Sequence, residues 1–313
     1  MSFIDSVSVA LHKLAWRLVR IAASVPTAIA AVITEPGAHP WRFIATYLLN
    51  GDIARRMRSS IALKRGDVPG LRMYGDQIRI GTAGAVIDLR HSTVTEGLLH
   101  GIIMQYLDVW YPCITRHPIP FFTGEGPYQS GQCTIRRGDV VIDAGANFGI
   151  FTWYASEQVG DAGTVLAFEP SSSCVNLLQR SVRSSTIGHR VRVVQKGLAA
   201  RASVTHFTTK DLSAGNVPVA GDPSIPSERV ELISLDEYAR HTGLPRVDFI
   251  KADIEGMEVD LLIGAEQTIR TYKPRISICT YHAANHRQLL TELLLAYRPD
   301  YQIVYTAAKL HAW

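Results

Sequence analysis

The stretch Gly138-Asp-Val-Val-Ile-Asp-Ala-Gly-Ala-Asn-Phe-Gly149 decides the fold class of this chain. Residues 140–142 are apolar like a buried parallel strand, and Gly145 and Gly149 then let the backbone approach a ligand that a side chain would exclude. A helix that begins near Asn147 would point its first unpaired N–H groups at the same ligand. The stretch therefore predicts an α/β domain with a nucleotide-type cofactor pocket.

The spacing of the glycines indicates which cofactor binds. A dinucleotide fingerprint reads G-x-G-x-x-G, whereas this turn has Asp143, Gly145 and Gly149 and no glycine at position 147. A carboxylate before such a turn suits a cofactor with a cationic amino acid end, which S-adenosylmethionine (SAM) has. A second predicted strand, Gly163-Thr-Val-Leu-Ala-Phe-Glu-Pro170, ends in Glu169, where a ribose-binding carboxylate is expected. Together these features predict SAM.

Size, charge and cysteine usage limit the class of protein. The chain has 313 residues, 47% of them hydrophobic, which is enough for one large core or for a core domain with an appended smaller unit. The net charge of +4 is mild and the catalytic half has no long basic run, so a small or medium-sized substrate is favoured over nucleic acid. Four cysteines without C-x-x-C spacing predict free thiols in a reducing, cytoplasmic compartment.

Residues 1–33 need an interpretation of their own. Basic residues precede an apolar stretch that is too short to span a bilayer and is broken by Pro26. Leu11, Leu14 and Leu18 recur at helical spacing, which predicts an amphipathic helix. This helix would pack within the protein or a homodimer, or it would make peripheral contact with a membrane.

The rest of the chain divides at the Pro- and Gly-rich interval 117–128, which predicts an N-terminal helical and mixed region over 1–124 and a catalytic domain over 125–313. The first region is predicted to contain a helix over 41–63, a hairpin around Gly75-Asp76, a strand over 86–89 and a helix over 95–110. Strands of the second are predicted at 139–143, 164–169, 191–196, 247–253, 275–281 and 301–306, with helices after the first, second, fourth and fifth. A short strand is predicted at 204–208 within the turn-rich interval 202–231, which would contact the substrate.

A second informative stretch is Val247-Asp-Phe-Ile-Lys-Ala-Asp-Ile-Glu-Gly-Met-Glu258, where Asp253, Glu255 and Glu258 follow a buried strand. Buried acids need a partner or a cation, so a divalent metal, a basic substrate or a proton-transfer role would explain them. Helix capping explains one acid but not three. Glu255 and Glu258 are three residues apart and are predicted to share a helix face.

The next predicted strand ends in His282. Because the carboxyl ends of parallel strands meet at one edge of a sheet, Asp253 and His282 are expected to lie close together there. They would form either a general-base pair or part of a metal site.

These linked motifs resemble the FkbM-type family of SAM-dependent methyltransferases over about residues 125–305. The resemblance is carried by the opening stretch, Ala167-Phe-Glu-Pro170, Ile233-Ser-Leu-Asp236, and Ile250 to Glu258 with Gly264-Ala265. It implies a class I methyltransferase (Rossmann-like) fold, with a seven-stranded sheet whose last strand is antiparallel. It also implies methyl transfer to a hydroxyl oxygen of a polyketide, a sugar or a lipid-linked glycan.

Roles in such a reaction follow as hypotheses. Gly145, Asn147 and Gly149 would hold the methionine end of SAM, Asp143 its amino group or a bridging water, and Glu169 the ribose, while Glu125 and Tyr128 would close over the cofactor.

His282 is the first choice as base, and Asp253 would orient it or help to hold Mg²⁺ or another divalent cation. The predicted metal ligands are Asp253, His282 and Glu255. Lys251 would steer the acceptor oxygen or simply pair with the acids.

Two rival functions use the same features. An NAD(P)-dependent oxidoreductase needs the same strand, turn and ribose acid, but the missing glycine at 147 and the acid cluster count against it. A non-catalytic SAM-fold binding protein would not need Asp143, Glu169 and Asp253 together.

Overall fold

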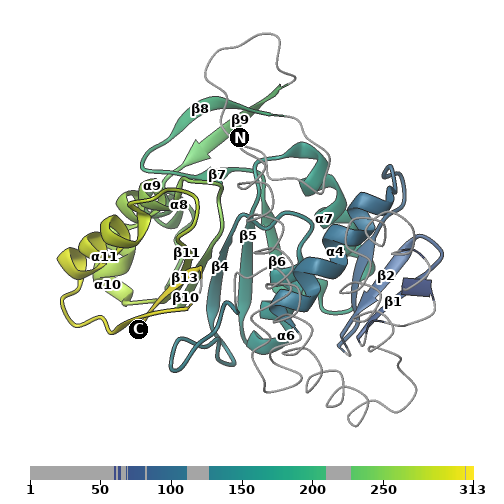
Figure 1. Ribbon diagram of the computed structural model, residues 1–313, viewed down its shortest axis with the longest axis horizontal. Helices are drawn as coiled ribbons and strands as arrows, with labels where there is room; N and C mark the ends of the chain where they lie inside the picture. The colour runs from purple at the N-terminus through teal and green to yellow at the C-terminus, as the bar shows by residue number, and fades with distance from the viewer. Residues whose placement is uncertain are drawn as a thin grey trace, which may run out of the picture.

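The computed structural model describes residues 60, 63–64, 68, 70–81, 83–110, 127–208, 227–306 and 308–313. Within them a seven-stranded sheet lies at the centre, and two three-stranded sheets flank it (Figure 1). The predictions for residues 1–33, for almost all of 41–63, for most of the 117–128 interval and for Glu125 lie outside the described residues.

The central sheet has the strand order of a class I methyltransferase. Its strands, in spatial order, are β12 (Ile303–Tyr305), β13 (Lys309–Ala312), β11 (Arg275–Cys279), β10 (Phe249–Ala252), β4 (Val140–Ala144), β5 (Thr164–Phe168) and β6 (Val191–Val194). The pairings from β11 to β6 are parallel, whereas β13 runs antiparallel to both of its neighbours. The fold class and the antiparallel last strand are therefore confirmed, and all six strands predicted for this domain are present.

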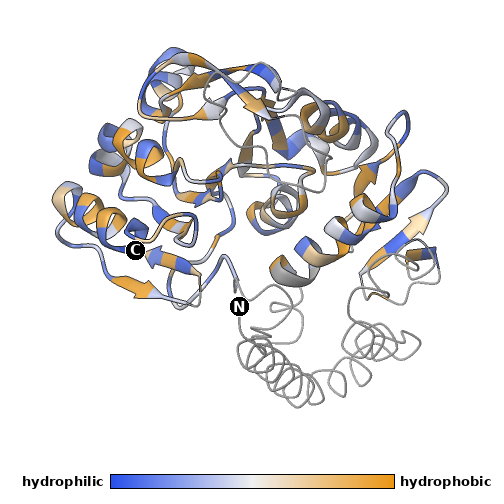
Figure 2. Ribbon diagram, turned by 45° about the horizontal axis from the view of Figure 1, so that its top comes forward, coloured by the Kyte–Doolittle hydropathy of each residue, from blue (hydrophilic) through white to orange (hydrophobic). Residues whose placement is uncertain are grey.

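The alternating side chains of the central strands feed two hydrophobic cores, one on each face of the sheet. Val141 belongs to the core that also contains residues of α4 (Glu96–Val109), α6 (Ile150–Val159) and α7 (Ser172–Ser184). Ile142, one residue later, belongs to the opposite core. The helices that cover this second core are α8 (Leu235–Thr242), α9 (Glu258–Gly264), α10 (Glu266–Tyr272) and α11 (His286–Tyr297). Figure 2 shows the apolar residues gathered along the strands and on the inward sides of the helices.

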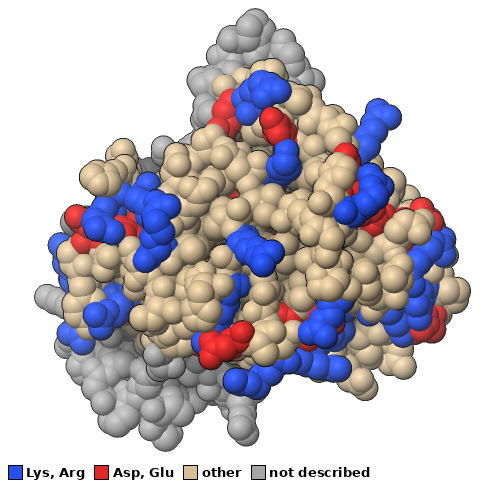
Figure 3. All heavy atoms as spheres, turned by 180° about the vertical axis from the view of Figure 1, so that it is seen from behind, with Lys and Arg blue, Asp and Glu red and all other residues tan. Residues whose placement is uncertain are grey.

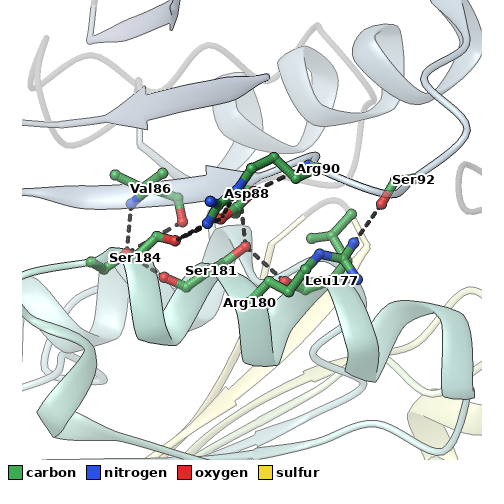
Figure 4. Close-up of polar contacts among 9 residues, drawn as sticks. Val86, Asp88, Arg90, Ser92, Leu177, Arg180, Ser181 and Ser184 are labelled. Atoms are coloured by element: carbon green, nitrogen blue, oxygen red, sulfur yellow. Dashed lines mark hydrogen bonds and ion pairs between the residues drawn. The ribbon is translucent and has the colours of Figure 1, made fainter. Parts of the chain in front are cut away.

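The N-terminal sheet packs against the catalytic domain. It consists of β1 (Leu71–Tyr74), β2 (Gln77–Ile80) and β3 (Ala85–Asp88), as the predicted hairpin and strand required. Asp88 on β3 pairs with Arg90 and accepts a hydrogen bond from Ser184 at 2.6 Å, and its N–H donates to Ser181 at 2.9 Å (Figure 4). The β1–β3 sheet and α4 therefore share a core with the catalytic domain, and a domain boundary at 124 stays a prediction.

A third sheet lies beyond the carboxyl ends of the central strands. It combines β7 (Gly197–Leu198), β8 (Ser203–Thr208) and β9 (Ser227–Ile233), and a short 3-10 helix, η1 (Gly188–Arg190), precedes β6. The predicted strand at 204–208 is confirmed as β8, whereas β9 and α8 were not predicted from the sequence. Residues 209–226 of the predicted substrate-contacting interval lie outside the described residues.

Among the described residues, no helix combines the length and the apolar character that crossing a membrane requires. Figure 3 shows one face of the molecule, on which Lys and Arg side chains lie at scattered points, many of them beside an acid. Pairs such as Arg298 with Asp300, 2.9 Å apart, have this character.

Candidate active site

The turn after β4 curls because three of its residues adopt left-handed backbone conformations. Gly145, Asn147 and Gly149 have φ values of +76°, +50° and +92°. These conformations delay the helix, so that α6 begins at Ile150 instead of near Asn147 as the sequence predicted.

Packing against backbone requires glycine at position 145, and the left-handed backbone favours glycine at position 149. A Cβ atom at Gly145 would lie 2.0 Å from the backbone oxygen of Asp253, and one at Gly149 would lie 2.5 Å from a methyl carbon of Leu178. The first of these contacts joins the two informative stretches of the sequence, residues 138–149 and residues 247–258, directly. The cofactor turn and the acid cluster are therefore neighbours in space.

Glu169 lies at the end of β5, beside this turn. Its carboxylate accepts hydrogen bonds from the N–H groups of Asn147 at 2.8 Å and Ser171 at 2.9 Å, and the residue is only 7% exposed. Burial raises the pKa of Glu169 to about 7 despite these donors. The predicted ribose carboxylate is thus next to the predicted cofactor turn.

Asp143 and Lys251 form a buried ion pair beneath the turn. Lys251 Nζ lies 3.0 Å from Asp143 Oδ1, and the Thr152 hydroxyl donates to Asp143 Oδ2 at 2.6 Å. The same ammonium group donates to the carbonyl oxygens of Ala144 at 3.2 Å and Gly145 at 2.7 Å. Burial opposes the charge of Lys251, but the adjacent carboxylates outweigh it and raise its pKa. Of the two predicted roles for Lys251, the geometry shows pairing with an acid.

Asp253 follows β10 and is held by two phenols. Tyr128 donates to its Oδ2 at 2.7 Å and Tyr281 to its Oδ1 at 3.0 Å. Burial opposes ionisation, yet Lys251, the hydrogen bond from Tyr128 and Lys309 together lower the pKa of Asp253, which is therefore ionised at neutral pH. Tyr281 and Lys309 were not predicted, although Tyr281 stands next to His282 in the sequence.

Lys309 reaches the site from β13. It is fully buried, and its ammonium nitrogen lies 4.2 Å from the centre of the Tyr128 ring, a cation–π contact. The hydrophobic pattern of the sequence does not identify this strand, because a lysine is normally expected at the surface and this one is buried.

His282 lies among three carboxylates, as the predicted meeting of strand ends required. Its Nε2 is 3.7 Å from Asp253 Oδ1 and 3.6 Å from Glu255 Oε2, while its Nδ1 is 2.8 Å from Glu258 Oε1. Burial opposes the charged ring, but these carboxylates outweigh it and raise the pKa of His282. The expected proximity to Asp253 is confirmed, and Glu258 is the nearest of the three acids.

Glu255 and Glu258 do not share a helix face. Glu255 and Gly256 have φ values of +55° and +102°, and α9 begins only at Glu258. The prediction was wrong because these two left-handed residues form a turn where a helix was expected. Glu258 is fully buried, and its Oε1 accepts a hydrogen bond from the Ile254 N–H at 3.0 Å.

Comparison with known proteins places this chain among methyltransferases. A family model described as "Methyltransferase FkbM domain" matches residues 143–301, just over half of the chain. The chain is 26% identical over 184 residues to methyltransferase sdnD of Sordaria araneosa, covering 49% of this chain and 71% of that protein. It is 26% identical over 146 residues to methyltransferase 1 of Beauveria bassiana (strain ARSEF 2860), covering 40% and 58%.

Among solved structures, a methyltransferase FkbM from Methylobacillus flagellatus KT is 22% identical, with a TM-score of 0.48. The match covers 69% of this chain and 53% of that one. The chain thus spans little more than half the length of this protein and of the Beauveria relative.

Proposed function

This chain belongs to the FkbM methyltransferase family, and from that premise we propose that it transfers the methyl group of SAM to a hydroxyl oxygen. The proposed acceptor is a sugar, a glycolipid or a polyketide-like small molecule. The observation that carries the proposal is the contact between the glycine turn of residues 138–149 and the acid-rich stretch of residues 247–258. Because Gly145 packs against the Asp253 backbone, the predicted cofactor turn lies beside a cluster of acids and an imidazole.

The turn and its supports would hold the cofactor. Gly145, Asn147 and Gly149 would face the methionine end, and the Glu169 carboxylate would accept hydrogen bonds from the ribose hydroxyls. When bound, SAM supplies an electrophilic methyl group on a sulfonium. The carboxylate of Asp143 already pairs with Lys251 and accepts a hydrogen bond from Thr152. Asp143 would therefore either hold the turn in place or bind the amino group of SAM through a water molecule.

Tyr128 is the member of the predicted closing pair that the structure describes. Its hydroxyl donates to Asp253, and its ring packs edge-on against Phe151 of α6 with ring centres 5.2 Å apart. This position joins the helix after the cofactor turn to the acid cluster, which supports a role in closing the pocket.

The cluster around His282 would act on the acceptor. An attacking hydroxyl oxygen must be aligned with the methyl group and must lose its proton, and a positioned base typically contributes about 10²–10⁴-fold to the rate. His282 Nε2 faces Asp253 and Glu255 and is proposed to receive the proton. A divalent cation such as Mg²⁺ is the alternative means of lowering the pKa of the hydroxyl, and Asp253 and His282 would hold it.

Calorimetry with SAM, S-adenosylhomocysteine and NAD would separate the proposal from the NAD(P)-dependent oxidoreductase. We expect SAM and S-adenosylhomocysteine to bind and NAD not to bind. Binding of NAD alone would overturn the assignment.

Turnover would then be followed as S-adenosylhomocysteine release with a panel of hydroxylated acceptors. Asp253→Ala and His282→Ala are expected to lose turnover while retaining cofactor binding. If both variants kept full turnover, the catalytic assignment would be wrong. Cofactor binding without turnover on any acceptor would favour the non-catalytic binding protein.

The predicted homodimer, the peripheral membrane contact through residues 1–33 and the cytoplasmic location stay predictions. Fractionation of cells expressing the full chain and a variant without residues 1–33 would test the membrane contact.

A further inference from the structure

Within the described part of the chain, three buried polar atoms without a hydrogen-bond partner lie on Glu258 and the two histidines near it. They are Glu258 Oε2, His286 Nδ1 and Nε2 of His282, whereas Nδ1 of His282 is paired with Glu258 Oε1. The side chains of Glu258, His282 and His286 are 0%, 10% and 7% exposed. Buried polar groups in native proteins are nearly always satisfied, so such a group calls for an ion, a water or a ligand.

The distances among these side chains suit a shared ligand. His282 Nδ1 is 2.8 Å from Glu258 Oε1, and His286 Nδ1 is 3.5 Å from Glu258 Oε2. One ligand atom each from Asp253, Glu258 and His282 lie within 4.8 Å of one another. Since metal–ligand bonds are about 2.0–2.6 Å long, two ligands of one ion lie at most about 4–5 Å apart. The three side chains therefore fit around one cation.

We propose that Asp253, Glu258 and His282 form a binding site for a first-row divalent metal cation, with His286 positioned to hold the second oxygen of Glu258. The inference rests on the proposed function, because it specifies the cation-assisted form of that reaction. It replaces Glu255 of the sequence-based ligand set with Glu258. Glu255 Oε2 lies 3.6 Å from the imidazole, but its side chain is 40% exposed and the residue lies in a left-handed turn. Glu258 is buried, and its Oε1 lies 2.8 Å from the imidazole.

The donor set indicates which cations bind. Mg²⁺ prefers oxygen ligands in an octahedron and keeps several waters, whereas an imidazole nitrogen combined with carboxylates suits Mn²⁺, Fe²⁺ or Zn²⁺. Tyr128 and Tyr281 donate to Asp253 and would orient it, as outer-shell partners of metal ligands do. Two carboxylates would neutralise the charge of the ion.

The test is a titration of chelator-treated full-length protein with Mn²⁺, in which free Mn²⁺ is measured by electron paramagnetic resonance. We expect the wild type to bind a single Mn²⁺ per chain, and equimolar Mg²⁺ not to displace it. Glu258→Gln is expected to weaken binding by about tenfold or more. Glu255→Gln should have a smaller effect, and Glu266→Gln, a partly exposed residue of α10 paired with Arg270, should have none.

Calorimetry with S-adenosylhomocysteine on the same samples shows whether each variant is folded and separates the two proposals. Wild-type protein that binds this cofactor but not Mn²⁺ would overturn the metal site and leave the proposed function standing. Protein that binds Mn²⁺ but not the cofactor would overturn the proposed function. Should Glu258→Gln fail to bind the cofactor, Asp253→Asn replaces it, and unchanged Mn²⁺ affinity in a folded variant of either residue overturns the site.

Discussion

The two buried acid clusters of the site satisfy their charges in different ways. Beneath the glycine turn, Asp143 has Lys251 and Thr152, and Glu169 has two backbone N–H donors. At the ends of β10 and β11, by contrast, Glu258 and two histidines keep atoms without a hydrogen-bond partner among the described residues. The first cluster is completed by the chain itself. For the second we propose that a cation or the acceptor supplies the missing partner.

Asp253 connects the two clusters and shares features of both. Its carboxylate is held by two phenols of the protein, yet it also faces the imidazole of His282. Its backbone oxygen packs against Gly145, so a displacement of one cluster would be transmitted to the other.

The largest expected effect tests whether the first cluster is complete. Lys251→Met would leave Asp143 buried without its cation, which costs about 3–5 kcal/mol in the free energy of unfolding. Urea unfolding would measure it. Lys273→Met is the control, because Lys273 pairs with Asp300 near the surface and its loss should cost only about 0–1 kcal/mol. Equal effects of the two variants would contradict the comparison.

The pH dependence of stability tests the same cluster through Glu169. Because the pKa of Glu169 is raised from 4.5 to about 7, the folded state binds this proton more tightly than the unfolded state. The contribution to stability, on the order of 3 kcal/mol, is fully present below about pH 4.5 and is lost as pH rises through about 7. Thermal unfolding of the cofactor-free protein would measure this slope, and Glu169→Gln should abolish it.

Cofactor affinity gives the next effect. Glu169→Gln keeps the shape of the side chain but removes the charge that would accept the ribose hydroxyls, so S-adenosylhomocysteine affinity should fall about 10- to 100-fold. Calorimetry above pH 7 would measure it. Glu228→Gln is a matched control, since that half-buried carboxylate also accepts a hydrogen bond from a backbone N–H, that of Ser172, at 3.2 Å. Unchanged affinity in Glu169→Gln would remove Glu169 from the cofactor site.

The smallest effect separates the two phenols that hold Asp253. Tyr128→Phe removes a buried donor and should lower the free energy of unfolding by about 1.5 kcal/mol. Tyr281→Phe removes a donor from a side chain that is exposed to water, which can replace it, so about 0.5 kcal/mol is expected. Urea unfolding of both variants would show the order, and a reversed order would mean that Tyr281 is the main partner of Asp253.

Much of the fold was readable because its signals are local. The apolar runs of β4, β5, β10 and β11 are buried on both faces, so their composition alone marks them as central strands. The strand β13 was missed because Lys309 and His311 are polar and yet fully buried, which no hydrophobic pattern indicates. The burial of His311 also lowers its pKa to about 4, so it is neutral in the core.

The family motif Ile233-Ser-Leu-Asp236 likewise received its explanation only from the structure. Asp236 accepts hydrogen bonds from the N–H groups of Gln267 and Thr268, both at 2.8 Å. It therefore caps the first turn of α10 from the neighbouring helix α8, a structural role. Sequence reasoning could recognise the motif but not its partner, which lies about thirty residues away.

By itself the sequence determined the class I methyltransferase fold, the glycine turn of the predicted cofactor pocket, and the meeting of Asp253 with His282. The fold follows from the resemblance of the linked motifs to the FkbM family, the turn from its glycine spacing, and the meeting from the common edge at which parallel strands end. Only the tertiary structure decided which side chains face one another. It paired Lys251 with Asp143, brought Lys309 and Tyr128 to Asp253, and placed Glu258 nearer to the imidazole than Glu255. The physical reason is that left-handed turns and strand register set the direction of a side chain, and neither is encoded in the spacing of charged residues.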